Sequence, residues 1–417
     1  MLNVHVQNKT LPSDPRRSVS SPLVNKAHHL HARNYHDHAI QHCTVSEEGI
    51  PAVLTAHTLL AYYHHASTDH RLFRLAVWDT IRFVSNHRQT LTRSSEGWSA
   101  LQLWYRLCIS HRLGKPPSLL LEGEGLEKSH SRFGPSQDPE NFEDLYLSCI
   151  LNMSTDDIIY DILIKSIEIR NRLVVFQCVA GMYGSSVTAR DIGGVAHELL
   201  NNLIGRDSFD GEIDEAQKGF VRGSHLQSLL DIQGERLKVW ESRLREDQQP
   251  DCTTFPTHRD AMDALYAILV EMMIAESSNP SILHYHANRI LQILPTLDLT
   301  ASATADIYTF SLSEVLLKLV QIYQSDMLFA YILDILWPEL ERKSRGYEHS
   351  HYPTHLAKRI IAQLARYYDQ GKRVCYAVPA ANESTTKVQL LDVNRNIGIV
   401  CCGWSPKGYF VERNALL

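Results

Sequence analysis

The stretch DDIIYDILIKSIEIRNRLVVFQCV, residues 156–179, decides how this chain folds. It is long and strongly apolar, and a helix that is apolar on most of its faces is buried on most of them. Ser154 stands just before it and Asp157 follows three residues later, the pattern of a capping box with Asp in place of the usual Glu. The sequence therefore predicts a central, mostly buried helix that begins after Ser154.

Amphipathic helices are predicted on both sides of this stretch, from about residue 50 to about residue 370. Their ends carry the usual signals: Pro51 in a first turn, Asp69 as an N-cap and Gly114 as a C-terminal stop. Residues 115–139 are rich in Gly, Pro and Ser, which predicts a long surface loop. The other helices are predicted over residues 52–66, 70–87, 98–113, 140–151, 187–204, 257–277, from 280 onward, 303–323, 326–343, which Pro338 should kink or shorten, and 354–370.

A heptad pattern runs from His225 to Glu246. Two series of residues recur there every seven positions, which predicts a narrow packing seam with one polar interruption. Because three heptads are short, an antiparallel partner within the same bundle is favoured over a contact between two copies of the chain. The two series are Leu226, Gln233 and Trp240, and Leu230, Leu237 and Leu244.

After Gly371 the pattern changes from helix to strand. Short runs rich in Val, Ile and aromatic residues are divided by Asn, Gly and Pro, which is typical of an antiparallel meander. The runs are residues 373–378, 387–393, 396–404 and 408–412. The predicted fold class is therefore mainly α, a multi-helix array or bundle with a small C-terminal antiparallel β appendage.

Three parts follow from these patterns. Residues 1–45 are basic and His-rich and are predicted to be a flexible arm, residues 46–370 an all-α domain, and residues 371–417 a small β meander packed on the helical body. A net charge of −6 gives no case for a nucleic-acid surface over the whole chain. No secretory signal or membrane span is recognised, so cytosol or nucleus is the predicted compartment.

Cysteine and histidine patterns do not predict a metal site. The cysteines lack Cys-x-x-Cys spacing, so neither a redox motif nor the usual zinc spacing is present. His-rich tracts bind Zn²⁺ or Ni²⁺, but no Cys or acidic pair completes a shell around the histidines of the arm. The pairs His64-His65, His284/His286 and His349/His351 are interpreted as solvated or hydrogen-bonded. The cysteines are residues 43, 108, 149, 178, 252, 375, 401 and 402, and the arm carries His28, His29, His31, His36, His38 and His42.

The sharpest enzymatic candidate is Asp156-Asp157-Ile-Ile-Tyr-Asp161. Asp157 and Asp161 share a helix face, and carboxylates placed in this way can hold Mg²⁺ that binds a diphosphate. All-α terpene synthases carry such an aspartate-rich motif, together with a second metal motif that is not found in this sequence. Acidic residues in a first turn also complement the helix dipole, and this structural interpretation is favoured. The sequence thus predicts no catalytic residue, no cofactor and no metal ligand.

Several segments resemble the C-terminal regulatory domain of fungal binuclear zinc-cluster (Zn2Cys6) transcription factors. The likeness covers about residues 45–370 and lies in helix order, in first helices rich in aromatic residues and His, and in loop placement. The segments are AHTLLAYYHHASTDHRLFRLAVWDTIRFV (56–84), LQLWYRLCISHRLGKPPSLLLEG (101–123), YLSCILNMSTDDIIYDILIKSIEIRNRLVVF (146–176), LHYHANRILQILPTL (283–297) and FAYILDILWPEL (329–340).

The resemblance implies a fungal-specific transcription factor domain, all-α, which controls in the nucleus when a factor activates transcription. Some members are thought to hold a small apolar effector between helices. The six closely spaced cysteines of the family's DNA-reading zinc cluster are absent, which implies a truncated member, a mis-started gene model or a diverged regulator. Sequence-specific DNA binding by this chain is therefore not expected.

We expect a transcription regulator that is not an enzyme and that contacts the transcription machinery or a DNA-binding partner. The helices within residues 53–112 and 156–179 are expected to build the core and any pocket, and the seam at 225–246 and the meander to form partner surfaces. A small apolar effector and a homodimer stay open, and no membrane contact is expected. The alternatives are a Mg²⁺-dependent all-α enzyme of prenyl diphosphate chemistry and a ligand-free helical scaffold.

Overall fold

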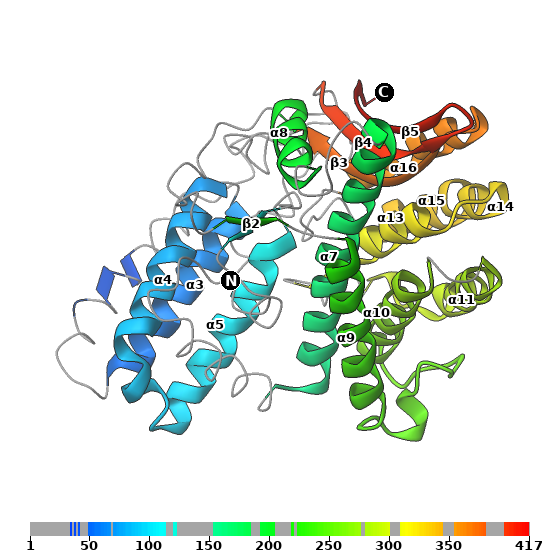
Figure 1. Cartoon of the computed structure of the whole chain (residues 1–417). Helices are drawn as coiled ribbons and strands as arrows, with labels where there is room; N and C mark the ends of the chain where they lie inside the picture. Colours follow the sequence, from blue (N-terminus) through cyan, green and yellow to red (C-terminus); the bar gives the residue numbers. More distant parts are fainter. Residues whose placement is uncertain are drawn as a thin grey trace. The chain divides into compact units, whose positions relative to one another are not determined.

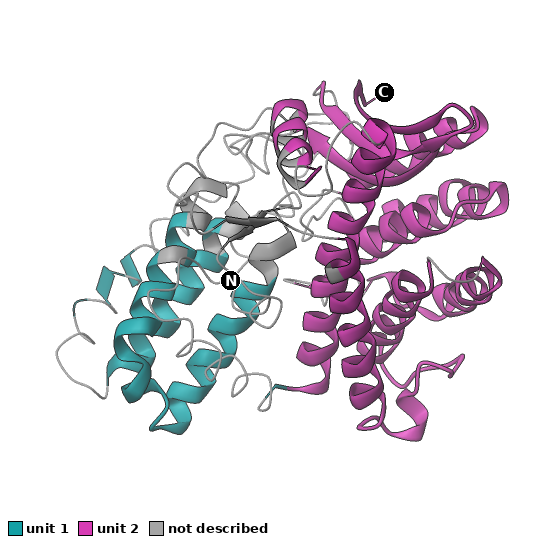
Figure 2. Ribbon diagram, viewed as in Figure 1, with its two compact units in different colours: residues 1–115, 127–153, 383–395 teal, residues 116–126, 154–382, 396–417 magenta. Residues whose placement is uncertain are grey.

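The described residues fall into two compact units (Figure 2). Unit 1 comprises residues 1–115, 127–153 and 383–395, and unit 2 comprises 116–126, 154–382 and 396–417. The range 46–370, which the sequence assigns to one all-α domain, is thus shared between the two units. The computed structural model describes residues 34–35, 37–38, 41, 49–67, 70–113, 120–122, 153–184, 192–204, 218–220, 223–276, 280–300, 309–344, 354–380 and 396–416.

Four predicted features lie wholly or almost wholly outside the described residues. They are the arm at 1–45, apart from a few residues between 34 and 41, the loop at 115–139, apart from 120–122, the helix at 140–151 and the strand at 387–393. The prediction of a mainly α fold with a small C-terminal β appendage is confirmed by the part of the chain that the structure describes.

Among the described residues of unit 1, three long helices pack on one another: α3 (Ile50–Ser67), α4 (His70–Leu91) and α5 (Ser95–Leu113) (Figure 1). Trp104 is buried between them, and its Nε1 donates to Thr80 Oγ1 at 3.1 Å. Thr80 Oγ1 in turn donates to the backbone carbonyl of Val77 at 2.6 Å, so both buried polar groups are satisfied. The predicted helices at 52–66, 70–87 and 98–113 are confirmed.

The helix predicted to be central is α7 (Thr155–Tyr183), which packs against helices and strands of unit 2 (Figure 1). Most of its residues are buried, as the apolar stretch indicates. Ser154 is its N-cap: the Ser154 hydroxyl accepts the Asp157 backbone N–H at 3.2 Å and donates to the Asp157 carboxylate at 3.1 Å. Both the central helix and its cap are confirmed.

The heptad seam belongs to α9 (Gly223–Glu241), which packs against α7 and α10 (His258–Ala275). Trp240 is buried, and its Nε1 donates to the Thr155 carbonyl at 2.8 Å. The intramolecular interpretation is therefore confirmed, and the expectation that the seam is a partner surface is wrong, because its side chains are enclosed in unit 2. The helix is also shorter than predicted and leaves Leu244 beyond its end. The buried seam residues are Leu226, Leu230, Gln233, Leu237 and Trp240.

Further helices of unit 2 follow the predicted order. Thr257 caps α10, and Ser311 with Glu314 forms a capping box on α13. A π-helical turn at Tyr331–Leu336 comes just before Pro338, the residue predicted to disturb its helix. The changed hydrogen-bond pattern of this turn accommodates the backbone N–H that proline lacks. The elements are α8 (Ile192–Ile204), α11 (Pro280–Ile293), α13 (Leu312–Ile322), α14 (Asp326–Ala330), α15 (Trp337–Ser344) and α16 (Thr354–Asp369).

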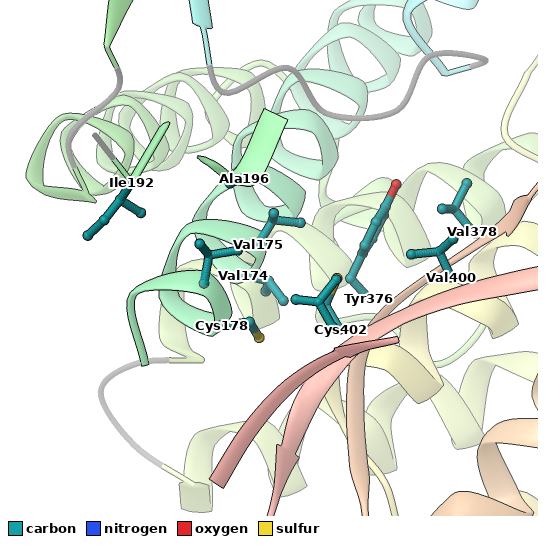
Figure 3. Close-up of a cluster of buried hydrophobic side chains, with 11 residues drawn as sticks. Val174, Val175, Cys178, Ile192, Ala196, Tyr376, Val378, Val400 and Cys402 are labelled. Carbon is teal, nitrogen blue, oxygen red and sulfur yellow. The ribbon is translucent and has the colours of Figure 1, made fainter. Parts of the chain in front are cut away.

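The C-terminal strands β3 (Arg373–Ala380), β4 (Gly398–Ser405) and β5 (Gly408–Ala415) form an antiparallel sheet in sequence order. Gly408 closes the β4–β5 hairpin with φ +122°, a conformation that favours glycine. One face of the sheet packs on α7 and α8 (Figure 3). The buried cluster there comprises Val174, Val175, Cys178, Val179, Ile192, Ala196, Tyr376, Val378, Val400, Cys402 and Val411.

A second, two-stranded sheet was not predicted. Strand β1 (Leu120–Glu122) pairs antiparallel with β2 (Lys218–Phe220). The sequence placed β1 inside a surface loop, and three residues are too few for a period-two pattern to be visible. None of the helices described combines the length and the apolar character needed to cross a bilayer.

Close packing of α7 against β5 yields a stability prediction. A Cβ at Gly181 would lie 2.1 Å from Cδ2 of the Tyr409 ring, so Gly181→Ala forces the ring to move. We expect a loss of about 1–3 kcal/mol in the free energy of unfolding, the usual result of overpacking. Urea titrations of Gly181→Ala, Tyr409→Ala and the double variant check it. A double variant that loses the sum of the two single effects would contradict the contact.

Candidate functional site

The aspartates that suggested a metal site have structural partners. Asp157 is bound to the Ser154 hydroxyl at the start of α7. Asp156, in the same turn, lies with one carboxylate oxygen 3.6 Å from Arg259 Nε of α10. These two carboxylates therefore complete the α7 N-terminus and link it to a neighbouring helix.

Asp161 lies one helical turn further on and is fully buried. Its Oδ2 accepts from Lys165 Nζ at 2.9 Å and from Arg236 of α9 at 2.7 Å. Arg236 also donates to the Gln233 side chain at 2.7 Å, which explains the one polar position of the seam. Asp157 and Asp161 thus share a helix face, as predicted, but Asp161 is held in a buried ion pair.

His284 is hydrogen-bonded, as predicted, whereas His286 is buried and its Nδ1 makes no hydrogen bond to the described residues. His284 Nδ1 lies 2.8 Å from the Tyr323 hydroxyl, and its Nε2 lies 3.0 Å from Asn288 Nδ2. Within the described ranges, no three His, Cys, Asp or Glu side chains come together in a way that could hold a metal ion. The pair His349/His351 lies outside those ranges.

A groove between α9 and α10 of unit 2 is open to solvent and carries several charged side chains. It has a volume of about 380 Å³. Carboxylates and one lysine stand on its α9 side, and apolar groups of both helices lie between them. The groove is lined by Asp231, Gly234, Glu235, Leu237, Lys238, Glu241, Glu271 and Ile274. We call it the α9–α10 groove.

Glu271 of α10 is the most perturbed acid in this groove. Burial and the neighbouring Glu241 carboxylate raise the pKa of Glu271 to about 7. Its Oε2 lies 3.3 Å from His286 Nδ1, without the alignment of a hydrogen bond. Burial and the charge of Arg289 lower the pKa of His286, so this contact is not a strong ion pair at neutral pH.

Negative charge is also concentrated at the end of the groove. Burial raises the pKa of Glu241, and the carboxylate of Asp251 adds to the effect. The positive charge of Arg289 of α11 acts against this rise in the pKa of Glu241. Arg289 also binds the Asp251 carboxylate at 3.0 Å and donates to the Pro250 carbonyl. The loop after α9 is thereby fastened to α11, with the acidic side of α9 left facing the groove.

The raised pKa of Glu271 predicts a pH-dependent stability difference. Folding raises this acid's pKa from 4.5 to about 7, so the folded state binds more protons between these values and loses stability as pH rises through them. Glu271→Gln removes this titration, while His286, Glu241, Asp251 and Arg289 remain. We expect the variant to gain on the order of 1–2 kcal/mol over the wild type from pH 5 to pH 8, because the side chain is 32% exposed and partly screened. Urea unfolding at several pH values checks it; a constant difference would contradict it.

Sequence reasoning missed a second polar cluster, which lies beneath β3. Arg170 of α7 is buried and binds both carboxylate oxygens of Glu276, at 2.6 and 2.7 Å. The same guanidinium donates to the carbonyls of Cys375 at 2.9 Å and Gln321 at 3.0 Å. An arginine inside a strongly apolar stretch was the available signal. The cluster joins the end of α10, α13 and β3 to the central helix.

Lys318 of α13 extends this cluster. Its Nζ donates to Asn171 at 3.1 Å and to Gln321 at 2.9 Å, and burial lowers its pKa to about 7. Gln321 Nε2 donates to the Ala377 carbonyl of β3 at 3.2 Å. These side chains satisfy backbone carbonyls of the outer strand, so the cluster has a clear structural role.

Comparison with protein-family models, with curated proteins and with solved structures finds no match to this chain.

Proposed function

We propose that this protein regulates transcription in the nucleus through contacts with other proteins, as a member of the fungal-specific transcription factor domain family that lacks the zinc cluster. The resemblance of residues 45–370 to that regulatory domain supports the proposal. An array of helices with a small β appendage is compatible with it. DNA would be reached through a DNA-binding partner or the transcription machinery.

The observation that carries the proposal is the contrast between the acidic motif and the α9–α10 groove. The carboxylates of Asp157 and Asp161 are engaged in a helix cap and a buried ion pair. The groove, in contrast, is open and lined by charged side chains of two packed helices. A groove that places charged side chains around partly apolar surface suits a protein segment that makes both kinds of contact.

A tethering assay tests the proposal. The chain is fused to a heterologous DNA-binding domain, and expression of a reporter that carries its binding site is measured. We expect a change of several-fold relative to the DNA-binding domain alone. Unchanged expression, from a fusion that is nuclear and occupies its site, would count against the proposal.

The alternative, prenyl diphosphate chemistry, is tested separately. The protein is incubated with prenyl diphosphates and Mg²⁺, with Asp157→Ala as control. We expect no turnover by the wild type. Turnover that disappears in the variant, although the variant keeps its fold, would reverse the ranking of the two functions.

A further inference from the structure

The α9–α10 groove is built by one face of α9. Asp231, Glu235, Lys238 and Glu241 recur at intervals of three and four residues, so their side chains follow one side of the helix. The adjoining side of α9 is the buried seam that packs on α7, and Leu237 belongs to both. The charged side chains of the groove are therefore held in place by the core but are not part of it.

Apolar groups form the floor of the groove. Leu237 is buried, and Ile274 of α10 contacts α9 at Gly234. A Cβ at Gly234 would lie 3.0 Å from Ile274 Cδ1, so the glycine lets Ile274 pack closely against α9. A partner that contacts Ile274 would therefore bury an apolar side chain here as well as meet charges.

The charge of the lining is one-sided. Four acidic groups, those of Asp231, Glu235, Glu241 and Glu271, stand against the single cation of Lys238, although Glu271, with its pKa raised to about 7, is only partly ionised at neutral pH. That cation is already paired with Glu235 at 2.7 Å. The Oε2 atom of Glu271 is buried and accepts no hydrogen bond from the described residues. A cationic occupant would neutralise this excess, and a partner of complementary charge is steered toward it.

We propose that the α9–α10 groove docks a segment of a partner protein that carries Lys or Arg residues around an apolar anchor. The anchor packs on the partly buried Ile274, and the cations meet the carboxylates of Asp231 and Glu235. A metal ion is a poorer match, because the described residues offer no set of three ligands that converge. This inference rests on the proposed function and names the kind of partner.

The test uses the full chain and a fluorescent, amphipathic Leu/Lys peptide, with a Leu/Glu peptide of the same length as the probe control. Binding is followed by fluorescence anisotropy. The groove variant is Asp231→Lys/Glu235→Lys. Its matched control, Glu198→Lys/Asp334→Lys, makes the same change in net charge at exposed positions of α8 and the π-helical turn. Circular dichroism confirms that each variant is folded.

We expect the groove variant to weaken Leu/Lys binding by about tenfold or more and the matched control by less than about twofold. The Leu/Glu peptide should not bind. A third variant, Gly234→Leu, keeps every charge and should weaken binding by filling the floor. Equal losses in the two charge variants would place the peptide elsewhere, and no loss in Gly234→Leu would mean attraction by charge alone. Either result would overturn the proposal.

The two proposals can fail separately. If the peptide binds as expected but reporter expression is unchanged in the tethering assay, the regulatory function is refuted and the proposed docking groove is supported. If reporter expression changes but the groove variant binds the peptide as well as the wild type does, the docking groove is refuted and the regulatory function is supported.

Discussion

Replacing Arg170 with methionine is expected to lower the free energy of unfolding by about 3–5 kcal/mol. The guanidinium is buried and makes bonds to Glu276 and to two backbone carbonyls. Methionine fills much of the volume but leaves a carboxylate and both carbonyls without their donor. Removing one partner of a buried pair costs this much because the other charge stays in a poorly solvated place.

Thermal unfolding measures the effect. A loss of this size lowers the melting temperature by on the order of 10 °C in a unit of this length. Arg245→Met is the matched control, because Arg245 is 69% exposed and lies 3.4 Å from Asp247 at the surface. The control should stay within about 0.5 kcal/mol of the wild type. Equal, small effects of both substitutions would mean that Arg170 does not join the sheet to the helices.

Replacing Asp161 with alanine should cost about 3–5 kcal/mol as well. Its carboxylate is the acceptor for Lys165, which is 4% exposed, and for Arg236. Alanine leaves the lysine charge buried without its partner. Asp157→Ala, which removes a partner of the N-cap, should cost about 1 kcal/mol or less. Urea titrations of both variants measure the two losses in unfolding free energy and show whether that of Asp161→Ala is the larger.

The same experiment separates a structural aspartate from a metal ligand. If Asp161 serves the fold, adding Lys165→Met to Asp161→Ala should restore part of the stability, because the buried charge is gone. Mg²⁺ should not change the unfolding free energy of the wild type. Stabilisation by Mg²⁺ that both aspartate variants abolish would instead indicate a metal site.

Local patterns predicted much of this fold. The apolar stretch at 156–179 became α7, and the Ser154 signal became its cap, because both depend on neighbours in the chain. The heptads of α9 gave the correct buried side, and the change of pattern after Gly371 gave the sheet. Each of these features is encoded within one or two turns of helix or within one strand.

Features that join distant residues could not be read in the same way. Strand β1 finds its partner nearly a hundred positions away, and each strand is only three residues long. Arg170 was passed over because its partner, Glu276, belongs to another helix. The groove was also unseen, because its carboxylates look like an ordinary solvated helix face until α10 places Glu271 and Ile274 beside them.

Regulation of transcription through a partner bound in the α9–α10 groove is tested most directly by a transcript profile. Cells carry the wild-type chain, a deletion, Asp231→Lys/Glu235→Lys, or the matched control Glu198→Lys/Asp334→Lys, each chain expressed at the same level. We predict that the groove variant alters the same transcripts as the deletion and that the matched control resembles the wild type. A deletion that changes transcripts which the groove variant leaves at wild-type levels would contradict this prediction.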